Sequence, residues 1–502
     1  MNNIFEIIRY HKDSDKTAII DGKYCWNYKQ IYNYIRTIDL KDVIFNSEKN
    51  IGILIENSLE YVLAYFTALK LGYTIVPINP KSKIYEIEKE LKFCEISTIF
   101  VSEKTVKTVR KLNKQIKKIL VNPDCKKQVF DEGKEHIYPL SLYRNADGKE
   151  VTRIDHLSSN EVAIMLQTSG TTNNPKKVML THKNIISNII SHSESVGLTE
   201  KDKVLISLPM FFGYCNTSQF LTHMYLGGTL HILGNFFQPH QVLKVLEEEK
   251  ISSYTAVPSM LLMLLKNKSR LSNYRLPHLK YIFFGGGIMP IKELKKLMDK
   301  FPHVQFIQTY GQTESSPRVT ALLGEDSKKK VGSVGKPIPN VEIKIVDEYG
   351  RQLKSGQVGE IIVRGDNVMK GYYKSKEATT QAIIDGYLYT GDLGYIDEDG
   401  YLFLKGRKKS LIISGGINIY PEEIEEKLLT HPNIINVVIT GKTDKIYGEI
   451  PVAFIEKKGQ ITKEDVIKYC EKFFSSYKIP KEVTFVQTLE RTYNGKNKRY
   501  HF

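Results

Sequence analysis

Short apolar runs rich in β-branched residues alternate along this chain with stretches whose apolar residues recur at helical spacing. This order is typical of βα units, in which helices connect the parallel strands of a sheet. We predict strands at residues 51–55, 74–78, 99–101, 162–166, 204–208, 254–257, 281–284 and 304–307, and helices that include residues 59–71 and 259–265. The expected fold class is therefore α/β.

One βαβ unit is legible residue by residue. The run KYIFF leads into the glycine loop 285–287, a helix begins after Pro290, and the run VQFIQ follows as a second strand. Because a crossover of this kind joins parallel strands, the loops after both strands emerge at the same edge of the sheet. We therefore expect the glycine loop and the segment YGQTE, residues 310–314, to face a common crevice.

The composition and the hydrophobic pattern of the chain change after Lys330. Glycines, prolines and short alternating runs predict antiparallel strands there, which form a small β-rich subdomain. From about residue 409 the pattern predicts a strand, a helix at 421–429, two strands and a helix at 462–474. We therefore predict a large N-terminal domain of βα sheets, residues 1–408, and a small, mobile α+β domain, residues 409–502, with the segment GRKKS as the linker.

The composition is that of a globular protein. The chain has 502 residues, 41% of them hydrophobic and 25% charged, and can bury a sizeable core without disulfides. Its five cysteines form no CxxC pair, which argues against a zinc cluster and an oxidised framework. Neither a signal peptide nor an apolar run of roughly 18 residues is apparent, so we expect a cytoplasmic protein without a membrane span.

The chain is basic, with 72 Lys and Arg against 56 Asp and Glu. Such a balance marks either a nucleic-acid binder or a protein whose ligands are anionic. In the densest basic stretch, residues 106–120, apolar residues fall at helical spacing, and we expect an amphipathic helix with a solvated basic face. RNA-binding motifs are not apparent, so nucleic acid is not an expected partner.

A polar loop, QTSGTTNNPKKV, follows the strand predicted at residues 162–166. Backbone N–H groups, hydroxyls and lysines in such a loop favour an anion such as a nucleotide phosphate chain. It is not a Walker P-loop, since Pro175 and Lys177 stand where that motif needs Gly and Ser or Thr. A polar turn without a ligand is the alternative.

Three further segments carry polar groups suited to nucleotide chemistry. YGQTE offers an aromatic face, a hydroxyl and the Glu314 carboxylate, which suits Mg²⁺. Asp392 and Arg407 lie fifteen residues apart across an apparent hairpin, where a plain salt bridge is the alternative. Lys496, in the tail RTYNGKNKRYHF, would neutralise charge in a transition state, whereas the alternative is a solvated basic tail.

Together and in this order, these segments resemble the adenylate-forming superfamily of acyl-CoA synthetases, peptide-synthetase adenylation domains and luciferases. The resemblance covers most of the chain and is strongest to the acyl-CoA synthetases. It is carried by TSGTTNNPKKV, YGQTE, VRGDNVMKGYY, YTGDLGYIDEDGYLFLKGRKKSLIISGGINIYPEEIE and NGKNKR, with LKLGYTIVPINP and LPMFF as weaker matches.

The resemblance implies that a carboxylic acid attacks the α-phosphate of Mg·ATP to give acyl-AMP and pyrophosphate, after which a thiol displaces AMP. It assigns ATP binding to Thr168, Ser169, Gly170, Thr171, Thr172, Lys176, Gly285, Gly286, Gly287, Tyr310, Gly311, Thr313, Asp392 and Arg407. It assigns the Mg²⁺ site to Thr168 and Glu314, and to Lys496 a bridge between the reacting carboxylate and phosphate. Lys409 matches the hinge about which the small domain rotates between the two half-reactions.

The phosphate loop departs from the family pattern TTGxPKG at two positions. Asn173 and Lys177 replace glycines. Asn tolerates positive φ well, so Asn173 is a mild change. Lys177 either clashes or adds a contact to phosphate.

The segment after LP bears on the acid. Amino-acid-activating members of the family place an Asp there, but residues 209–215, PMFFGYC, contain no acidic side chain. An unpaired buried ammonium is costly, so we expect an apolar acid, fatty or aryl. Phe211, Phe212 and Tyr214 either line its pocket or belong to the core.

The thiol acceptor is expected to be CoA. The loop at Gly415 and Gly416 resembles the acyl-CoA synthetase version, which borders the pantetheine tunnel. The phosphopantetheine arm of an acyl carrier protein presents the same thiol and is the alternative. A ligase that has lost activity and acts only as a partner protein would not need Lys496 and Glu314, and both are present.

Overall fold

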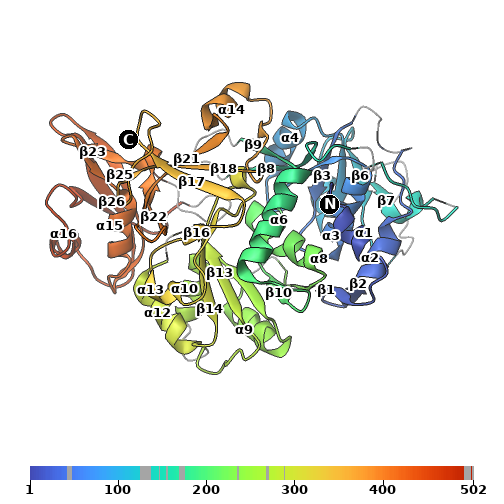
Figure 1. The fold of residues 1–502 in the computed structure, drawn as a ribbon, viewed down its shortest axis with the longest axis horizontal. Helices are drawn as coiled ribbons and strands as arrows, with labels where there is room; N and C mark the ends of the chain where they lie inside the picture. Colours follow the sequence, from blue (N-terminus) through green and yellow to red (C-terminus); the bar gives the residue numbers. More distant parts are fainter. Residues whose placement is uncertain are drawn as a thin grey trace.

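The computed structural model describes residues 1–41, 44, 48–124, 137–145, 147–153, 157–168, 176–234, 237–266, 271–287, 289–490 and 499. The described residues form four β-sheets with helices packed around them. Figure 1 shows the N-terminal elements in blue at one end of the molecule and the C-terminal elements in orange and red at the other.

The first sheet has nine strands, and its central six run parallel. In spatial order the nine strands are β16 (Lys336–Pro337), β15 (Thr320–Ala321), β14 (Gln305–Tyr310), β13 (Tyr281–Gly285), β12 (Ser253–Ala256), β10 (Lys203–Ile206), β11 (Thr229–Ile232), β1 (Thr17–Asp21) and β2 (Tyr24–Asn27). The parallel part runs from β14 to β1. The parallel strands are short, apolar and buried on both faces, as expected where helices cover a sheet.

The second sheet has eight strands and is parallel from β8 to β7. In spatial order these are β19 (Gly371–Tyr372), β9 (Lys177–Thr181), β8 (Val162–Gln167), β4 (Thr74–Pro77), β3 (Asn50–Leu54), β5 (Thr98–Val101), β6 (Lys117–Leu120) and β7 (Ile137–Pro139). Helix α3 (Leu59–Lys70) contacts strands of both sheets and is buried almost all round. The two sheets therefore share one hydrophobic core.

The other helices of the large sheets are α1 (Glu6–Tyr10), α2 (Tyr28–Ile35), α4 (Ile84–Phe93), α5 (Glu103–Val109), α6 (His182–Val196), α8 (Thr222–Leu226), α9 (Pro239–Glu248), α10 (Pro258–Lys266), α12 (Ile291–Lys300) and α13 (Asp326–Lys329). Between β10 and α8 lie a short helix α7 (Gly213–Cys215) and a π-helix η3 (Asn216–Leu221). Helix α6 begins at a capping box, in which the Thr181 hydroxyl accepts from the Asn184 N–H at 3.1 Å, and ends at Gly197.

The third sheet is antiparallel and follows the large sheets in sequence. Its strands are β17 (Val341–Val346), β18 (Gly359–Gly365), β21 (Tyr387–Ile396), β20 (Ile383–Ile384) and β22 (Leu402–Arg407), with α14 (Lys376–Ala382) between β19 and β20. This is the small β-rich subdomain expected after Lys330.

The fourth sheet and its helices use only residues after 411. Its strands are β24 (Ile417–Ile419), β23 (Ile412–Ser414), β26 (Gly448–Lys457), β25 (Ile434–Asp444) and β27 (Glu482–Val486), covered by α15 (Pro421–Leu428) and α16 (Lys463–Glu471). These elements bury a hydrophobic core of their own. An α/β fold with a smaller C-terminal unit is confirmed.

The helix predicted at residues 106–120 is wrong in its second half. Helix α5 ends at Val109, and KKIL forms β6, which pairs in parallel with β5 and β7. Asn113 turns the chain, since its side chain accepts from the Gln115 N–H at 3.0 Å, a local bond that competes with helix. Lys118 is buried, and its Nζ donates to the Asn113 carbonyl at 3.3 Å rather than facing solvent.

The expectations on membranes and cysteines concern the described residues only. None of the helices described is long and apolar enough to cross a membrane. Cys25, Cys94, Cys215 and Cys470 carry free thiols.

The His182 side chain predicts a loss of stability in acid. It is buried, its Nδ1 accepts from the Ile4 N–H at 3.2 Å, and burial lowers its pKa to about 4. Between about pH 4 and the usual histidine pKa of about 6.5, the unfolded chain therefore binds the extra proton and folding stability rises with pH.

We expect the unfolding free energy of the wild type to fall, as pH drops from 6.5 to 4, by up to about 1.4 kcal/mol per pH unit more than that of His182→Gln. Urea unfolding across this range measures the difference. His278→Gln, at an exposed histidine, is the control and should keep the wild-type slope. Equal slopes for the wild type and His182→Gln would contradict the assignment.

Candidate nucleotide and acyl site

Strands β13 and β14 bring the glycine loop and YGQTE together, as the sequence predicts. The strands are parallel, and Gly285 pairs with Thr309 at their carboxyl ends. A Cβ on Gly285 would lie 2.5 Å from the Thr309 carbonyl oxygen, and one on Gly311 would lie 1.6 Å from that of Pro317. Only glycine allows these approaches, which hold the two loops at one edge of the sheet.

Asp392 connects the first sheet to the third. It pairs with Arg407 across β21 and β22, and the Arg407 Nε lies 2.6 Å from its Oδ1. The Tyr310 hydroxyl donates to the other carboxylate oxygen at 2.8 Å. Burial first, and then the Asp392 carboxylate, raises the pKa of Tyr310 well above its usual value. The salt bridge that the sequence left as an alternative is therefore present, and it lies beside YGQTE.

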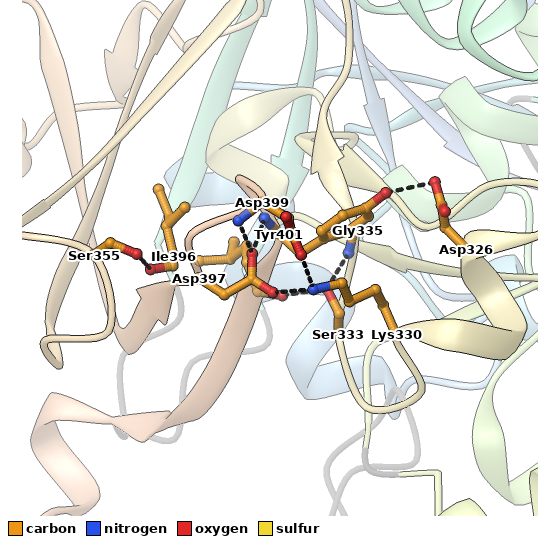
Figure 2. Close-up of polar contacts among 10 residues, drawn as sticks. Asp326, Lys330, Ser333, Gly335, Ser355, Ile396, Asp397, Asp399 and Tyr401 are labelled. Carbon is orange, nitrogen blue, oxygen red and sulfur yellow. Dashed lines mark hydrogen bonds and ion pairs between the residues drawn. The ribbon is translucent and has the colours of Figure 1, made fainter.

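The hairpin that carries Asp392 and Arg407 is braced at its other end (Figure 2). Lys330 Nζ donates to Asp397 at 2.8 Å and to Asp399 at 2.5 Å, and the Tyr401 hydroxyl donates to Asp326. The Ser333 hydroxyl donates to the Leu402 carbonyl at 2.7 Å. These contacts attach the β21–β22 turn to the segment after β15, which helps to fix the height of the two strands relative to β14.

The described ends of the polar loop meet beside Glu314. The Thr168 N–H donates to the Lys176 carbonyl at 3.0 Å, which closes the neck of the loop. Lys176 Nζ lies 4.5 Å from the centroid of the Tyr372 ring, and the Tyr372 hydroxyl donates to Glu314 Oε1 at 2.9 Å. Ser169, Gly170, Thr171, Thr172 and Asn173 lie outside the described residues. The sequence did not single out Tyr372, although it stands in the matching segment VMKGYY.

The two groups of residues are electrostatic neighbours. Arg407 interacts with Glu314 as well as with Asp392. Thr313 begins a short 3-10 helix, η4 (Thr313–Ser315), that carries Glu314. Elements of three sheets therefore bring cations and carboxylates to one place, an arrangement suited to a bound polyanion and a cation.

Lys177 turns away from the polar loop. It is the first residue of β9, pairs with Gln167 on β8, and is 3% exposed. Its Nζ forms a buried ion pair with Glu90 on α4. The sequence predicted that Lys177 would either clash or contact a phosphate. The structure shows neither, because Lys177 pairs with Glu90 instead.

The aromatic segment after Pro209 reaches the same sheet edge. Phe211 and Phe212 are half-buried, with ring centroids 4.5 Å apart, so they are neither core residues nor fully exposed. The Tyr214 hydroxyl lies 3.1 Å from Thr309 Oγ1. Above the Tyr214 ring, at 5.3 Å, lies the guanidinium of Arg318, a buried residue that the sequence did not single out. The sequence feature that could have identified Arg318 is a charged residue directly after YGQTESSP.

The predicted residues of the C-terminal part are placed only in part. Lys409 is exposed in a short 3-10 turn, η5 (Lys408–Ser410), between the third and fourth sheets. Gly415 and Gly416, with φ of 56° and 80°, form the two-residue turn of the β23–β24 hairpin, which needs left-handed residues. Lys496 lies outside the described residues.

The Lys177–Glu90 pair generates a stability prediction. Lys177→Met leaves the Glu90 carboxylate largely buried without its partner, which should cost about 3–5 kcal/mol of unfolding free energy. Urea unfolding measures it, and the double variant Lys177→Met, Glu90→Leu should recover most of the loss. Because Lys177 faces away from the loop, Lys177→Met should leave the KM for any nucleotide unchanged. A raised KM with intact stability would place Lys177 at the ligand instead.

Comparison with known proteins shows to which family the chain belongs. The family of AMP-binding enzymes matches residues 9–373, and the C-terminal domain of AMP-binding enzymes matches residues 423–496. A 2-succinylbenzoate–CoA ligase of Bacillus cytotoxicus is 31% identical over 89% of this chain and 86% of that protein. One of Bacillus cereus is 35% identical over 96% of this chain and 94% of that protein.

Solved structures agree in fold. The o-succinylbenzoate CoA synthetase of Bacillus subtilis, in complex with its acyl-adenylate intermediate, superposes with a TM-score of 0.83 at 26% identity and covers 99% of this chain and 97% of its own. The same enzyme with ATP and a magnesium ion also gives a TM-score of 0.83 at 26% identity, over 99% of this chain and 98% of its own. The chain belongs to the family of AMP-binding enzymes.

Proposed function

We propose that this protein activates an aryl carboxylic acid with Mg·ATP to an acyl adenylate and then transfers the acyl group to CoA, in the cytoplasm, where its free cysteines stay reduced. The observation that carries the proposal is the meeting of Lys176, Tyr372 and Glu314 with Tyr310, Asp392 and Arg407 at one sheet edge. The named activity of the relatives supports the choice of an acid–CoA ligase.

The first step needs charge neutralisation, because a carboxylate and a triphosphate repel each other. A carboxylate oxygen attacks the α-phosphorus, and the bond from that phosphorus to pyrophosphate breaks. Lys176 and the loop 168–172 would hold the phosphates, and Lys496 would approach the reacting oxygens. Asp392 and Arg407 would bind the ribose hydroxyls, with Tyr310 beside adenine.

The residues present suit a magnesium ion. Glu314 and Thr168 offer the hard oxygen ligands that Mg²⁺ prefers, and Tyr372 orients the Glu314 carboxylate by a bond to one oxygen. When bound, the ion would neutralise charge on the phosphate oxygens. The second step is attack of the CoA thiolate on the acyl carbon, with AMP leaving.

The relatives also narrow the acid and the acceptor. Their named substrate is aromatic and their named acceptor is CoA, so we favour an aryl acid over a fatty acid, and CoA over a carrier protein. The half-buried rings of Phe211 and Phe212, with Tyr214, would contact the aryl group. The turn at Gly415 and Gly416 would border the pantetheine arm.

We also propose that residues 1–408 and 409–502 are the two domains, with the hinge at Lys409. The exposed turn that contains Lys409 separates two independent cores. Rotation there would remove Lys496 from the site after adenylation.

The proposal predicts which acids support the release of pyrophosphate from ATP. With Mg·ATP and hydroxylamine, we expect release with 2-succinylbenzoate and related aryl acids, at least about tenfold faster than with fatty or amino acids. Addition of CoA should give the acyl-CoA, detected by mass spectrometry. Release confined to fatty acids would overturn the aryl assignment, and adenylation without a CoA product would indicate a carrier protein.

The two lysines of the C-terminal part should separate the half-reactions. Lys496→Ala should lower pyrophosphate release by about 10²–10³-fold, as when one charge-stabilising donor is removed, while supplied acyl adenylate is still converted to acyl-CoA. Lys409→Pro should keep adenylation but impair thioester formation, because the hinge stiffens. Unchanged thioester formation by Lys409→Pro would contradict the assignment of the hinge to Lys409.

A further inference from the structure

Arg499 attaches the C-terminal tail to helix α15. Its guanidinium donates to both oxygens of the Glu425 carboxylate, from Nη1 at 2.9 Å and from Nη2 at 3.2 Å. The same Nη2 donates to Glu422 Oε1 at 2.6 Å, and Nη1 also donates to the Ile439 carbonyl on β25. Because the Arg499 side chain is only 15% exposed, salt and water screen these ion pairs little. Arg499 is therefore tied to three residues of the C-terminal unit.

The Glu425 carboxylate is a rigid point of attachment. It is buried, and its Oε1 also accepts the Ile439 N–H at 2.8 Å, which joins α15 to β25. Burial raises the pKa of the Glu425 carboxyl, and the Arg499 guanidinium opposes that shift. Two parallel bonds between a guanidinium and a carboxylate fix direction as well as distance. The Arg499 side chain is therefore held in one orientation.

Glu422 connects this attachment to the nucleotide side of the molecule. Helix α15, which carries Glu422, contacts β22, the strand that ends at Arg407 (Figure 1). A Cβ on Gly406 would lie 2.3 Å from Glu422 Oε2, so only glycine lets the carboxylate come this close to the strand. Glu422 also interacts electrostatically with Arg407, to which the proposed function gives the ribose. The residue that holds Arg499 thus lies beside a proposed nucleotide-binding residue.

The position of Arg499 limits where Lys496 can be, because only three residues separate them in the sequence. A chain spans at most about 3.6 Å per residue, so a fixed Arg499 keeps the Lys496 Cα within about 11 Å of its own. The proposed adenylation step needs Lys496 beside the reacting oxygens, and a misplacement of roughly 1 Å can lower a rate by about 10²-fold. A tail without this attachment would lose more conformational entropy each time Lys496 entered the site.

We propose that Arg499 is a positioning residue for adenylation, which holds the tail on α15 through Glu422 and Glu425 so that Lys496 is presented to the nucleotide site. This inference rests on the proposed function and adds a residue to it. Arg499 acts through Lys496 and does not itself touch the reacting atoms. Its removal should therefore slow the half-reaction that needs Lys496 and spare the other.

Single variants test whether the two half-reactions separate. Arg499→Met should slow pyrophosphate release with 2-succinylbenzoate by about 10- to 10²-fold, while the KM for ATP stays within about twofold. Supplied acyl adenylate should still be converted to acyl-CoA at the wild-type rate. Arg499→Lys keeps a charge beside Glu425, and so protects the fold, but it cannot form the same paired bonds and should lose roughly three- to tenfold. Lys478→Met removes another partly buried ion pair to α15, with Glu423, and as the matched control should behave like the wild type.

A double variant separates positioning from a general structural effect. Because Arg499 acts through Lys496, Arg499→Met should cause no further loss of pyrophosphate release, within about twofold, in a Lys496→Ala background. The same loss with and without Lys496, or a loss of both half-reactions, would show that Arg499 is only structural. Wild-type pyrophosphate release by both Arg499 variants would overturn the inference and leave the proposed function intact. No release by the wild type with any acid would overturn the proposed function as well.

Discussion

The pairing of β13 with β14 is the contact on which the rest of the site depends. Their parallel register sets Gly285 against Thr309, so close that a methyl group would not fit. Tyr310 and Glu314 follow at once, and they meet Asp392 from the third sheet and Tyr372 from the edge of the second. The site therefore forms where parallel strands end, at the edge of the sheet at which α/β proteins commonly bind their ligands.

The charged side chains of the site and the core differ in how they are paired. Near the proposed nucleotide site, Arg407 and Glu314 have partners that leave them within reach of a ligand, and the Arg407 side chain is half exposed. Behind the second sheet, Lys177 and Glu90 neutralise each other in the core. Arg318 is buried without a carboxylate from the described residues.

The sequence predicts what depends on period and order, and fails where a single side chain decides. Short apolar runs bounded by turn residues predicted β3, β8 and β13 and the βαβ unit, because such runs are a local signal. The prediction of one helix over residues 106–120 is wrong in its second half, because α5 ends at Val109, the chain turns at Asn113 and Lys117–Leu120 joins the sheet. The direction of Lys177 depends on Glu90, 87 residues away. The backbone of Arg318 is held by Asn188 on α6, 130 residues away. Such contacts between distant segments have no local pattern.

We propose that acid activation here proceeds through a mixed anhydride of the acid with AMP. A single-turnover experiment with ATP labelled at the α-phosphorus, excess enzyme, 2-succinylbenzoate and no CoA tests it most directly. We expect the label to appear in an enzyme-bound acyl adenylate and to be released as free AMP when CoA is added. Label in ADP, or AMP formed at the same rate without acid, would contradict it.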